Sequence, residues 1–156
     1  MKDGFIKVAA AGVSVTEADV KSNAAAIKAR MEQADAMGMN LVVFPELCVT
    51  SYSCGDLFYS NTLQRDALAA LEDLTAFSAG KYPVYVMGLP VRYRGKLYNC
   101  AAVLLDGQCL GIVPKTHLPN GGEFYEKRQF SSANVLPSDA AVAVNGYPLP
   151  MGSDLV

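Results

Sequence analysis

The sequence predicts an α/β protein with a mixed β-sheet, and three stretches carry that prediction. Residues 41–44, Leu-Val-Val-Phe, form a short continuous apolar run of the kind that a strand buried on both faces requires. Just ahead of it, residues 20–34 place apolar side chains at helical spacing. Asp106-Gly107 lies between two strand-like runs and is a strong hairpin signal. Parallel strands joined by a helix, followed by antiparallel hairpins, make a mixed sheet.

The first part of the chain predicts a β-α-β unit. Residues 5–12 have the composition of a strand, and Thr16 or Ser14 can cap the helix that follows. The strand at residues 41–44 comes next. Two strands connected through a helix run parallel in the same sheet.

The second part of the chain changes from parallel connections to hairpins. A second helix is predicted at residues 62–79, followed by a buried strand at residues 84–90. Turn signals at residues 94–95 and 145–146 each separate two strand-like runs. Lys115 ends one of these strands, so a charged residue stands at a strand end.

Composition limits the class of protein. A chain of 156 residues suggests one domain, and 51% hydrophobic residues is above the usual share. Thirteen basic and fifteen acidic residues, without a long basic cluster, make nucleic acid and anionic membranes improbable partners. No run approaches the roughly 18 apolar residues of a membrane span, and the start is unlike a signal peptide. We expect a cytoplasmic protein.

The cysteines give no metal site. The chain has four cysteines, no close Cys-x-x-Cys pair and a single histidine, so no zinc set is expected. Cys100 and Cys109 lie in strand-like runs and are interpreted as small buried hydrophobes. Cys48 and Cys54 flank the turn after Glu46 and are candidates for reactive thiols.

Glu46 is the first candidate functional residue. Pro45 removes a backbone donor and ends the strand, so Glu46 follows the carboxyl end of a buried strand. Ligands in open α/β sheets bind at such ends. The alternative is an ordinary loop carboxylate that caps a helix or faces water.

The polar segment after Lys115 has two interpretations. Glu123 and Glu126 would share one face of a helix, where Lys127 and Arg128 could pair with them. Taken alone, this segment is interpreted as a solvated loop.

Three motifs together resemble a known family. The chain contains "FPELCVTSYSCGDLF", in which Tyr52 follows Glu46 by six residues, then Pro-Lys at the end of a hairpin strand, then "EFYEKRQF". In this order they resemble the carbon–nitrogen hydrolase (nitrilase) superfamily and, within it, the N-terminal glutaminase domain of bacterial glutamine-dependent NAD synthetases. The resemblance covers residues 6 to about 156.

The resemblance implies a four-layer α-β-β-α sandwich with mixed sheets, of which this chain holds the N-terminal part, and a Glu-Lys-Cys triad. Glu46 matches the general base that takes the cysteine proton and passes it to the departing ammonia. Lys115 matches the cation that stabilises the tetrahedral oxyanion. A further glutamate orients the triad, and Glu126 fits it best by position, with Glu123 as the alternative.

Two positions near Glu46 also follow from the resemblance. Tyr52 matches an aromatic residue that lines the glutamine pocket. Ser51 stands where glycine is usual in this turn, so a small difference in the local backbone is expected.

The third triad member is expected outside this chain. In the family the cysteine lies in a motif similar to Ile-Cys-Glu-Asp, and none of the four cysteines here has that context. We therefore expect residues 1–156 to be an inactive N-terminal portion of the glutaminase domain, with the synthetase domain absent. Half a sandwich leaves apolar strand faces uncovered, which favours self-association and a homo-oligomer.

The function expected for the parent protein is glutamine hydrolysis that supplies ammonia for amidation of deamido-NAD to NAD. ATP with Mg is expected in the synthetase domain, and no cofactor is expected in residues 1–156. Two alternatives remain open: a stand-alone amidase, nitrilase or carbamoylase of the same superfamily, and a non-catalytic assembly module of this fold.

Overall fold

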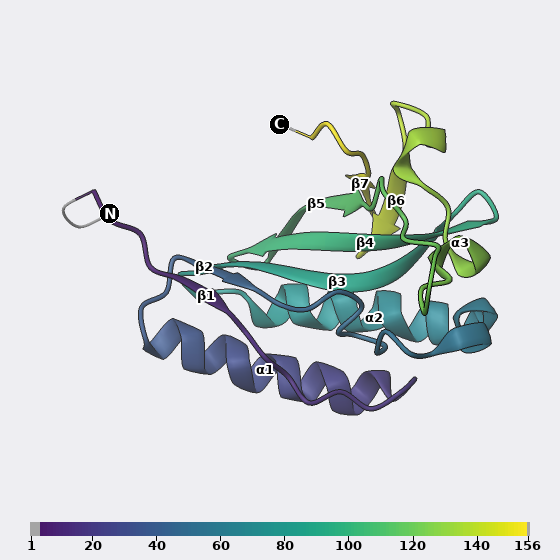
Figure 1. The fold of residues 1–156 in the computed structure, drawn as a ribbon. Helices are drawn as coiled ribbons and strands as arrows, with labels where there is room; N and C mark the ends of the chain where they lie inside the picture. The colour runs from purple at the N-terminus through teal and green to yellow at the C-terminus, as the bar shows by residue number, and fades with distance from the viewer. Residues whose placement is uncertain (1–3, 156) are drawn as a thin grey trace.

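The computed structural model describes residues 4–155 as a β-sheet with two long helices packed against one face (Figure 1). The sheet has five strands in the order β1-β2-β3-β4-β5. They are β1 (Val8–Ala10), β2 (Leu41–Val43), β3 (Val84–Tyr93), β4 (Lys96–Leu105) and β5 (Gln108–Pro114). The first three strands pair in parallel and the last three pair antiparallel. The prediction of a mixed α/β sheet is confirmed.

Helices α1 (Val20–Ala36) and α2 (Asn61–Phe77) connect the parallel strands. The predicted cap of α1 was wrong: Asp19 stands directly before the helix, and its carboxylate accepts from the backbone N–H of Ser22 at 3.0 Å. Thr16 lies too far upstream to reach that group, and its own N–H donates to the side chain of Asn23. Ser60 caps α2 through the N–H of Leu63.

The main core lies between the helices and the sheet. Removing this apolar surface from water is the main force that holds the two layers together. The largest fully buried side chains include Ile27 and Met31 of α1, Leu71 and Leu74 of α2, Tyr85, Met87 and Leu89 of β3, and Leu104 of β4. The Tyr85 hydroxyl donates to the backbone carbonyl of Met31, so the one polar atom of that side chain is satisfied.

The opposite face of the sheet is open within residues 4–155. Val8, Val43 and Val113 lie on this face and are 60%, 44% and 38% exposed. Residues 41–44 were predicted to be buried on both faces, and that prediction was wrong for Val43, because the helices cover one face only. The described residues form one helix layer and one main sheet layer.

The lengths of the strands differ from the prediction at both ends of the sheet. Of the predicted strand 5–12, only Val8–Ala10 form a continuous strand, which pairs with the three residues of β2, while Phe5 forms an isolated bridge. Strand β3 extends past residue 90 to Tyr93, because the Arg94-Gly95 turn keeps it paired with β4 up to Lys96.

Shorter elements complete the chain. The predicted hairpin at Asn145-Gly146 joins β6 (Ala141–Val144) to β7 (Tyr147–Pro150), and a bridge from Met151 to Ile112 places it beside β5. The short helix α3 (Glu126–Gln129) is followed by the 3-10 helix η2 (Ala133–Val135). It contacts another 3-10 helix, η1 (Gly55–Tyr59), from earlier in the chain. Within the described part of the chain, no helix is both long and apolar enough to cross a membrane.

Candidate active site

Glu46 stands in a tight turn at the carboxyl end of β2, where the sequence placed it. Phe44 still donates to the carbonyl of Val86 at 2.8 Å, and the chain leaves the sheet at Pro45. Leu47 then adopts a φ of 52°, and its carbonyl accepts from the N–H of Ser51 at 2.8 Å. This turn holds the Glu46 side chain at the end of the sheet, 41% exposed.

Lys115 directly follows β5 and is held through its backbone. Its N–H donates to the carbonyl of Asn99 in β4 at 2.8 Å, and its carbonyl accepts from the N–H of Ala133 in η2 at 3.0 Å. The side chain is only 26% exposed. The base of this long side chain is therefore fixed, and its ammonium group has little freedom.

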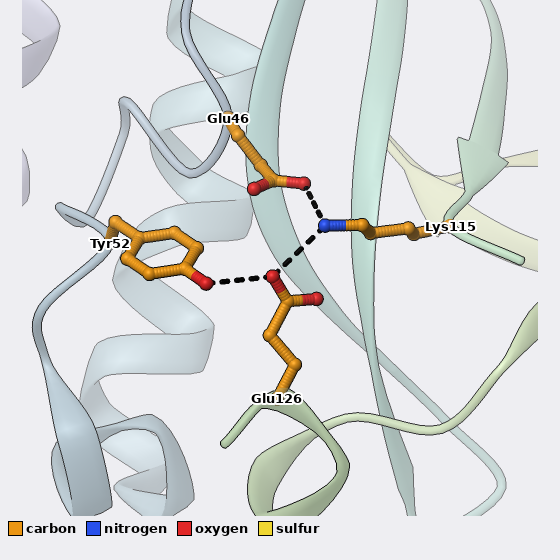
Figure 2. A network of polar contacts seen from close by, with 4 residues as sticks. All are labelled: Glu46, Tyr52, Lys115 and Glu126. Atoms are coloured by element: carbon orange, nitrogen blue, oxygen red, sulfur yellow. Dashed lines mark hydrogen bonds and ion pairs between the residues drawn. The ribbon is translucent and has the colours of Figure 1, made fainter. Parts of the chain in front are cut away.

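The ammonium group of Lys115 bridges two carboxylates (Figure 2). Its Nζ lies 2.6 Å from Oε1 of Glu46 and 2.9 Å from Oε1 of Glu126. The hydroxyl of Tyr52 donates to the same Glu126 oxygen at 2.8 Å. The structure thus brings all four sequence-predicted site residues into one network.

Glu126 is a buried residue in this network, so the solvated-loop interpretation was wrong for it. Its side chain is 4% exposed, whereas Glu123 is exposed, and the salt bridges of Lys115 among the described residues are to Glu46 and Glu126. The second carboxylate oxygen of Glu126, Oε2, is buried and has no hydrogen-bond partner among the described residues. Between the two glutamates that the sequence left open, the geometry favours Glu126.

Helix α3, which carries Glu126, is fastened to η1. The Arg128 guanidinium donates to both carboxylate oxygens of Asp56, at 3.0 and 2.7 Å, and the rings of Phe58 and Phe130 pack edge to face with centroids 4.9 Å apart. The expectation that Arg128 pairs with Glu123 or Glu126 was wrong, because Glu126 points inward to Lys115 while Arg128 faces η1. The sequence carried no signal for this pair beyond the two charges.

The electrostatics of the network keep Lys115 charged. Burial alone would lower the pKa of Lys115, but its hydrogen bonds to Glu46 and Glu126 outweigh that effect and raise the pKa above its ordinary value. Desolvation and the hydrogen bond to Glu126 raise the pKa of Tyr52, so its hydroxyl stays protonated as a donor. A permanent cation and a neutral donor therefore face the two carboxylates.

None of the four cysteine thiols takes part in this network within residues 4–155. Cys48, Cys54 and Cys100 are buried, and Cys109 is half-buried. The thiol of Cys48 lies 3.6 Å from the carbonyl of Gly88, and desolvation raises its pKa to about 11. Desolvation also raises the pKa of Cys54, whose thiol donates to the carbonyl of Thr50. These thiols are held protonated, which disfavours a nucleophilic role.

Two hollows border the network. One, of about 290 Å³, runs along the open sheet face and is lined by Glu46, Asn99 and Lys115 among apolar residues. The other, of about 330 Å³, is lined by Glu123 and Glu126 together with Tyr52 and other aromatic and polar residues. In the part of the chain that the structure describes, no cluster of three or more His, Cys, Asp or Glu side chains could hold a metal ion. The two carboxylates and the ammonium group of the network are suited to proton transfer and charge stabilisation.

Comparison with known protein families decides the relationship. The sequence profile of the carbon-nitrogen hydrolase family matches residues 7–151. The chain belongs to the carbon-nitrogen hydrolase family. Glu46, Lys115 and Glu126 all lie within the matched region of this carbon-nitrogen hydrolase.

Individual relatives agree with the motifs. This carbon-nitrogen hydrolase is 37% identical over 156 residues to a glutamine-dependent NAD(+) synthetase of Mycobacterium tuberculosis, covering 98% of this chain and 22% of that protein. The crystal structure of a glutamine-dependent NAD(+) synthetase from Cytophaga hutchinsonii superposes with a TM-score of 0.85 at 29% identity, over 94% of this chain and 25% of that one. An amidase from Nesterenkonia sp. shares the fold, with a TM-score of 0.70 at 16% identity, over 95% of this chain and 55% of that one.

These findings confirm the resemblance that the motifs indicated and the nitrilase-like α/β fold that it implied. The matched share of the curated relative is small. This carbon-nitrogen hydrolase spans about a fifth of that relative's length.

Proposed function

We propose that this carbon-nitrogen hydrolase is the N-terminal portion of the glutaminase domain of a glutamine-dependent NAD synthetase. In the full-length protein it would hydrolyse the side-chain amide of glutamine and supply ammonia for conversion of deamido-NAD to NAD. The observation that carries the proposal is the Lys115 ammonium held between Glu46 and Glu126, at 2.6 and 2.9 Å. Its similarity to glutamine-dependent NAD(+) synthetases supports glutamine as the substrate.

The proposed reaction uses a cysteine supplied from outside residues 1–156. Glu46 takes the thiol proton while sulfur bonds to the amide carbon, and Lys115 stabilises the negative oxygen that results. The carbon–nitrogen bond then breaks, and Glu46 returns the proton to the departing ammonia, leaving a thioester. Water adds to the thioester carbon, glutamate leaves, and the cysteine regains its proton.

Glu126 and Tyr52 have supporting roles in this proposal. Glu126 fixes the ammonium of Lys115 from the side opposite Glu46, and the Tyr52 hydroxyl holds Glu126. Tyr52 also lines the hollow beside Glu126, which suits its role as a wall of the glutamine pocket. A carboxylate that is 4% exposed depends on such partners, because an unpaired buried charge is costly.

The remaining substrates would bind elsewhere in the full-length protein. ATP with Mg would activate deamido-NAD in a separate synthetase domain, and the ammonia would pass to it.

Assays of the full-length gene product test this function. With glutamine, ATP and deamido-NAD, the protein is expected to form NAD, and purified residues 1–156 alone are expected to release no ammonia. Turnover of short amides or carbamoyl compounds without NAD formation would instead identify a stand-alone amidase. Absence of any hydrolysis would favour a non-catalytic module, and measurable glutamine hydrolysis by residues 1–156 would contradict the predicted inactivity.

A further inference from the structure

Gly88, in the middle of β3, lies directly beneath the turn that carries Glu46. Its carbonyl accepts from the N–H of Val49 at 3.2 Å and lies 3.6 Å from the thiol of Cys48. Its φ lies outside the left-handed region, so the conformational freedom of glycine is not what this position needs. What matters here is the space above its Cα atom.

A side chain at residue 88 would collide with the backbone on both sides of Glu46. A Cβ atom there would lie 2.3 Å from the nitrogen of Leu47, 2.7 Å from the oxygen of Pro45 and 2.8 Å from the carbonyl carbon of Glu46. All three are main-chain atoms, so no side chain can rotate away to relieve the contact. At Gly88 the backbone of the turn therefore packs directly against the backbone of the sheet.

The backbone of the turn is held on several sides, so it cannot shift locally without moving Glu46. Leu47 is fully buried and already adopts a φ of 52°, which is unfavourable for a residue with a side chain. Its carbonyl is tied to Ser51, and Val49 is tied to Gly88. A push from residue 88 would therefore move the backbone that carries the Glu46 side chain.

We propose that Gly88 is a positioning residue for Glu46, because it lets the turn sit close enough to the sheet for the carboxylate to meet Lys115. The inference rests on the proposed function, in which Glu46 is the base. Relieving the shortest contact from 2.3 Å to the 3.0 Å that real Cβ atoms keep requires a shift of at least 0.7 Å. A misplacement of about 1 Å in a catalytic group can lower turnover by about 100-fold.

The test is a double-mutant cycle in the full-length enzyme, with Gly88→Ala, Glu46→Gln and the double variant compared by kcat and KM for glutamine. Gly88→Ala is expected to lower kcat about 100-fold and to leave KM within about threefold of the wild type. In the Glu46→Gln background the same change is expected to have no further effect. Gly12→Ala is the control, because a Cβ there meets nothing within 4 Å.

Each outcome of the cycle decides one question. If Glu46→Gln lowers kcat and Gly88→Ala lowers it as much again in that background, Gly88 does not act through Glu46 and the inference is wrong. If Glu46→Gln keeps full turnover, the proposed function itself fails. Circular dichroism gives the folded fraction of Gly88→Ala, so that kcat is calculated per folded molecule. Wild-type kcat per folded molecule, or a variant that does not fold at all, would overturn the positioning role.

Discussion

The ammonium nitrogen of Lys115 lies 2.6 Å from Oε1 of Glu46, although 69 positions separate the two residues in the chain. They follow β5 and β2, which are separated in the sheet by β3 and β4. Three strand spacings amount to about 14 Å, so the gap is closed by the turn at Glu46 and by the length of the lysine side chain. The contact thus depends on the pairing of β2 with β3, β4 and β5.

Lys115→Met should destabilise the protein at neutral pH. The change leaves the carboxylate of Glu126 buried without its cation, and removing one partner of a buried ion pair costs about 3 kcal/mol. Denaturant unfolding of the full-length protein measures this loss. Lys96→Met, at an exposed hairpin position, is the control and should change the free energy of unfolding by less than about 0.5 kcal/mol. Equal effects from the two changes would show that the ion pair of Lys115 with Glu126 does not contribute to the free energy of unfolding.

The stability that Lys115 provides should depend on pH in the alkaline range. The pKa of Lys115 is raised in the folded protein, so the native state binds this proton more tightly than the unfolded chain does. Its contribution is then complete below the unfolded lysine pKa, about 10.4, and is lost as pH rises through the folded value. The difference in Tm between wild type and Lys115→Met should stay constant from pH 7 to 9 and shrink above that range. A difference that shrinks between pH 7 and 9 would contradict the raised pKa.

Tyr52→Phe should lower kcat/KM for glutamine about tenfold, because a hydrogen bond to a charged partner is worth roughly 1.5 kcal/mol. The variant keeps the ring and loses only the hydroxyl that donates to Glu126. Because the pKa of Tyr52 is raised, the loss should be the same from pH 6 to 9. Tyr147→Phe, at an exposed tyrosine, should leave kcat/KM unchanged. A loss confined to the upper end of this pH range would indicate that Tyr52 titrates instead.

Ser51→Gly should raise the free energy of unfolding by about 1 kcal/mol. Ser51 has a φ of 79°, so the backbone here keeps the conformation that glycine favours despite the serine. Removing its side chain relieves that strain at the cost of a hydrogen bond to Ser53. Ser53 has no positive φ, and Ser53→Gly should instead be neutral or destabilising. A decrease in stability for Ser51→Gly would show that the serine hydroxyl outweighs the strain.

Residues 1–156 expressed alone should self-associate. The open sheet face exposes Val8, Val43 and Val113, and exposed apolar strand surface favours association with another chain. Light scattering of the purified segment should give a mass above that of one chain. Val43→Lys should reduce the association without touching the helix side of the core. A strictly monomeric segment would contradict this prediction.

The elements of the fold were predictable because their signals are local. Apolar runs marked the strands, Asp-Gly and Asn-Gly marked two hairpins, and helical spacing marked α1 and α2. Errors arose where the length or burial of a strand depends on other strands of the sheet. β1 is shorter than predicted, since it pairs with the three residues of β2. Val43 is exposed because the helices cover only one face of the sheet, and which face they cover depends on the complete fold.

The site was predictable as a set of residues but not as a geometry. Motif resemblance pointed to Glu46, Tyr52, Lys115 and Glu126, and the structure brings them together. The sequence favoured Glu126 by position and left Glu123 as the alternative, because which of the two glutamates is buried depends on how this segment packs. The close contact between Gly88 and the Glu46 turn also had no signal in the sequence, since it joins segments about 40 residues apart.

The most direct measurement is steady-state turnover of glutamine by the full-length enzyme carrying Glu46→Gln. The side-chain shape is kept and only the base is lost, so kcat should fall about 1,000-fold, within the range for removal of a general base. Glu32→Gln makes the same chemical change at an exposed glutamate of α1 and should keep wild-type turnover. If Glu46→Gln also keeps near-wild-type turnover, Glu46 is not the base and is an ordinary loop carboxylate.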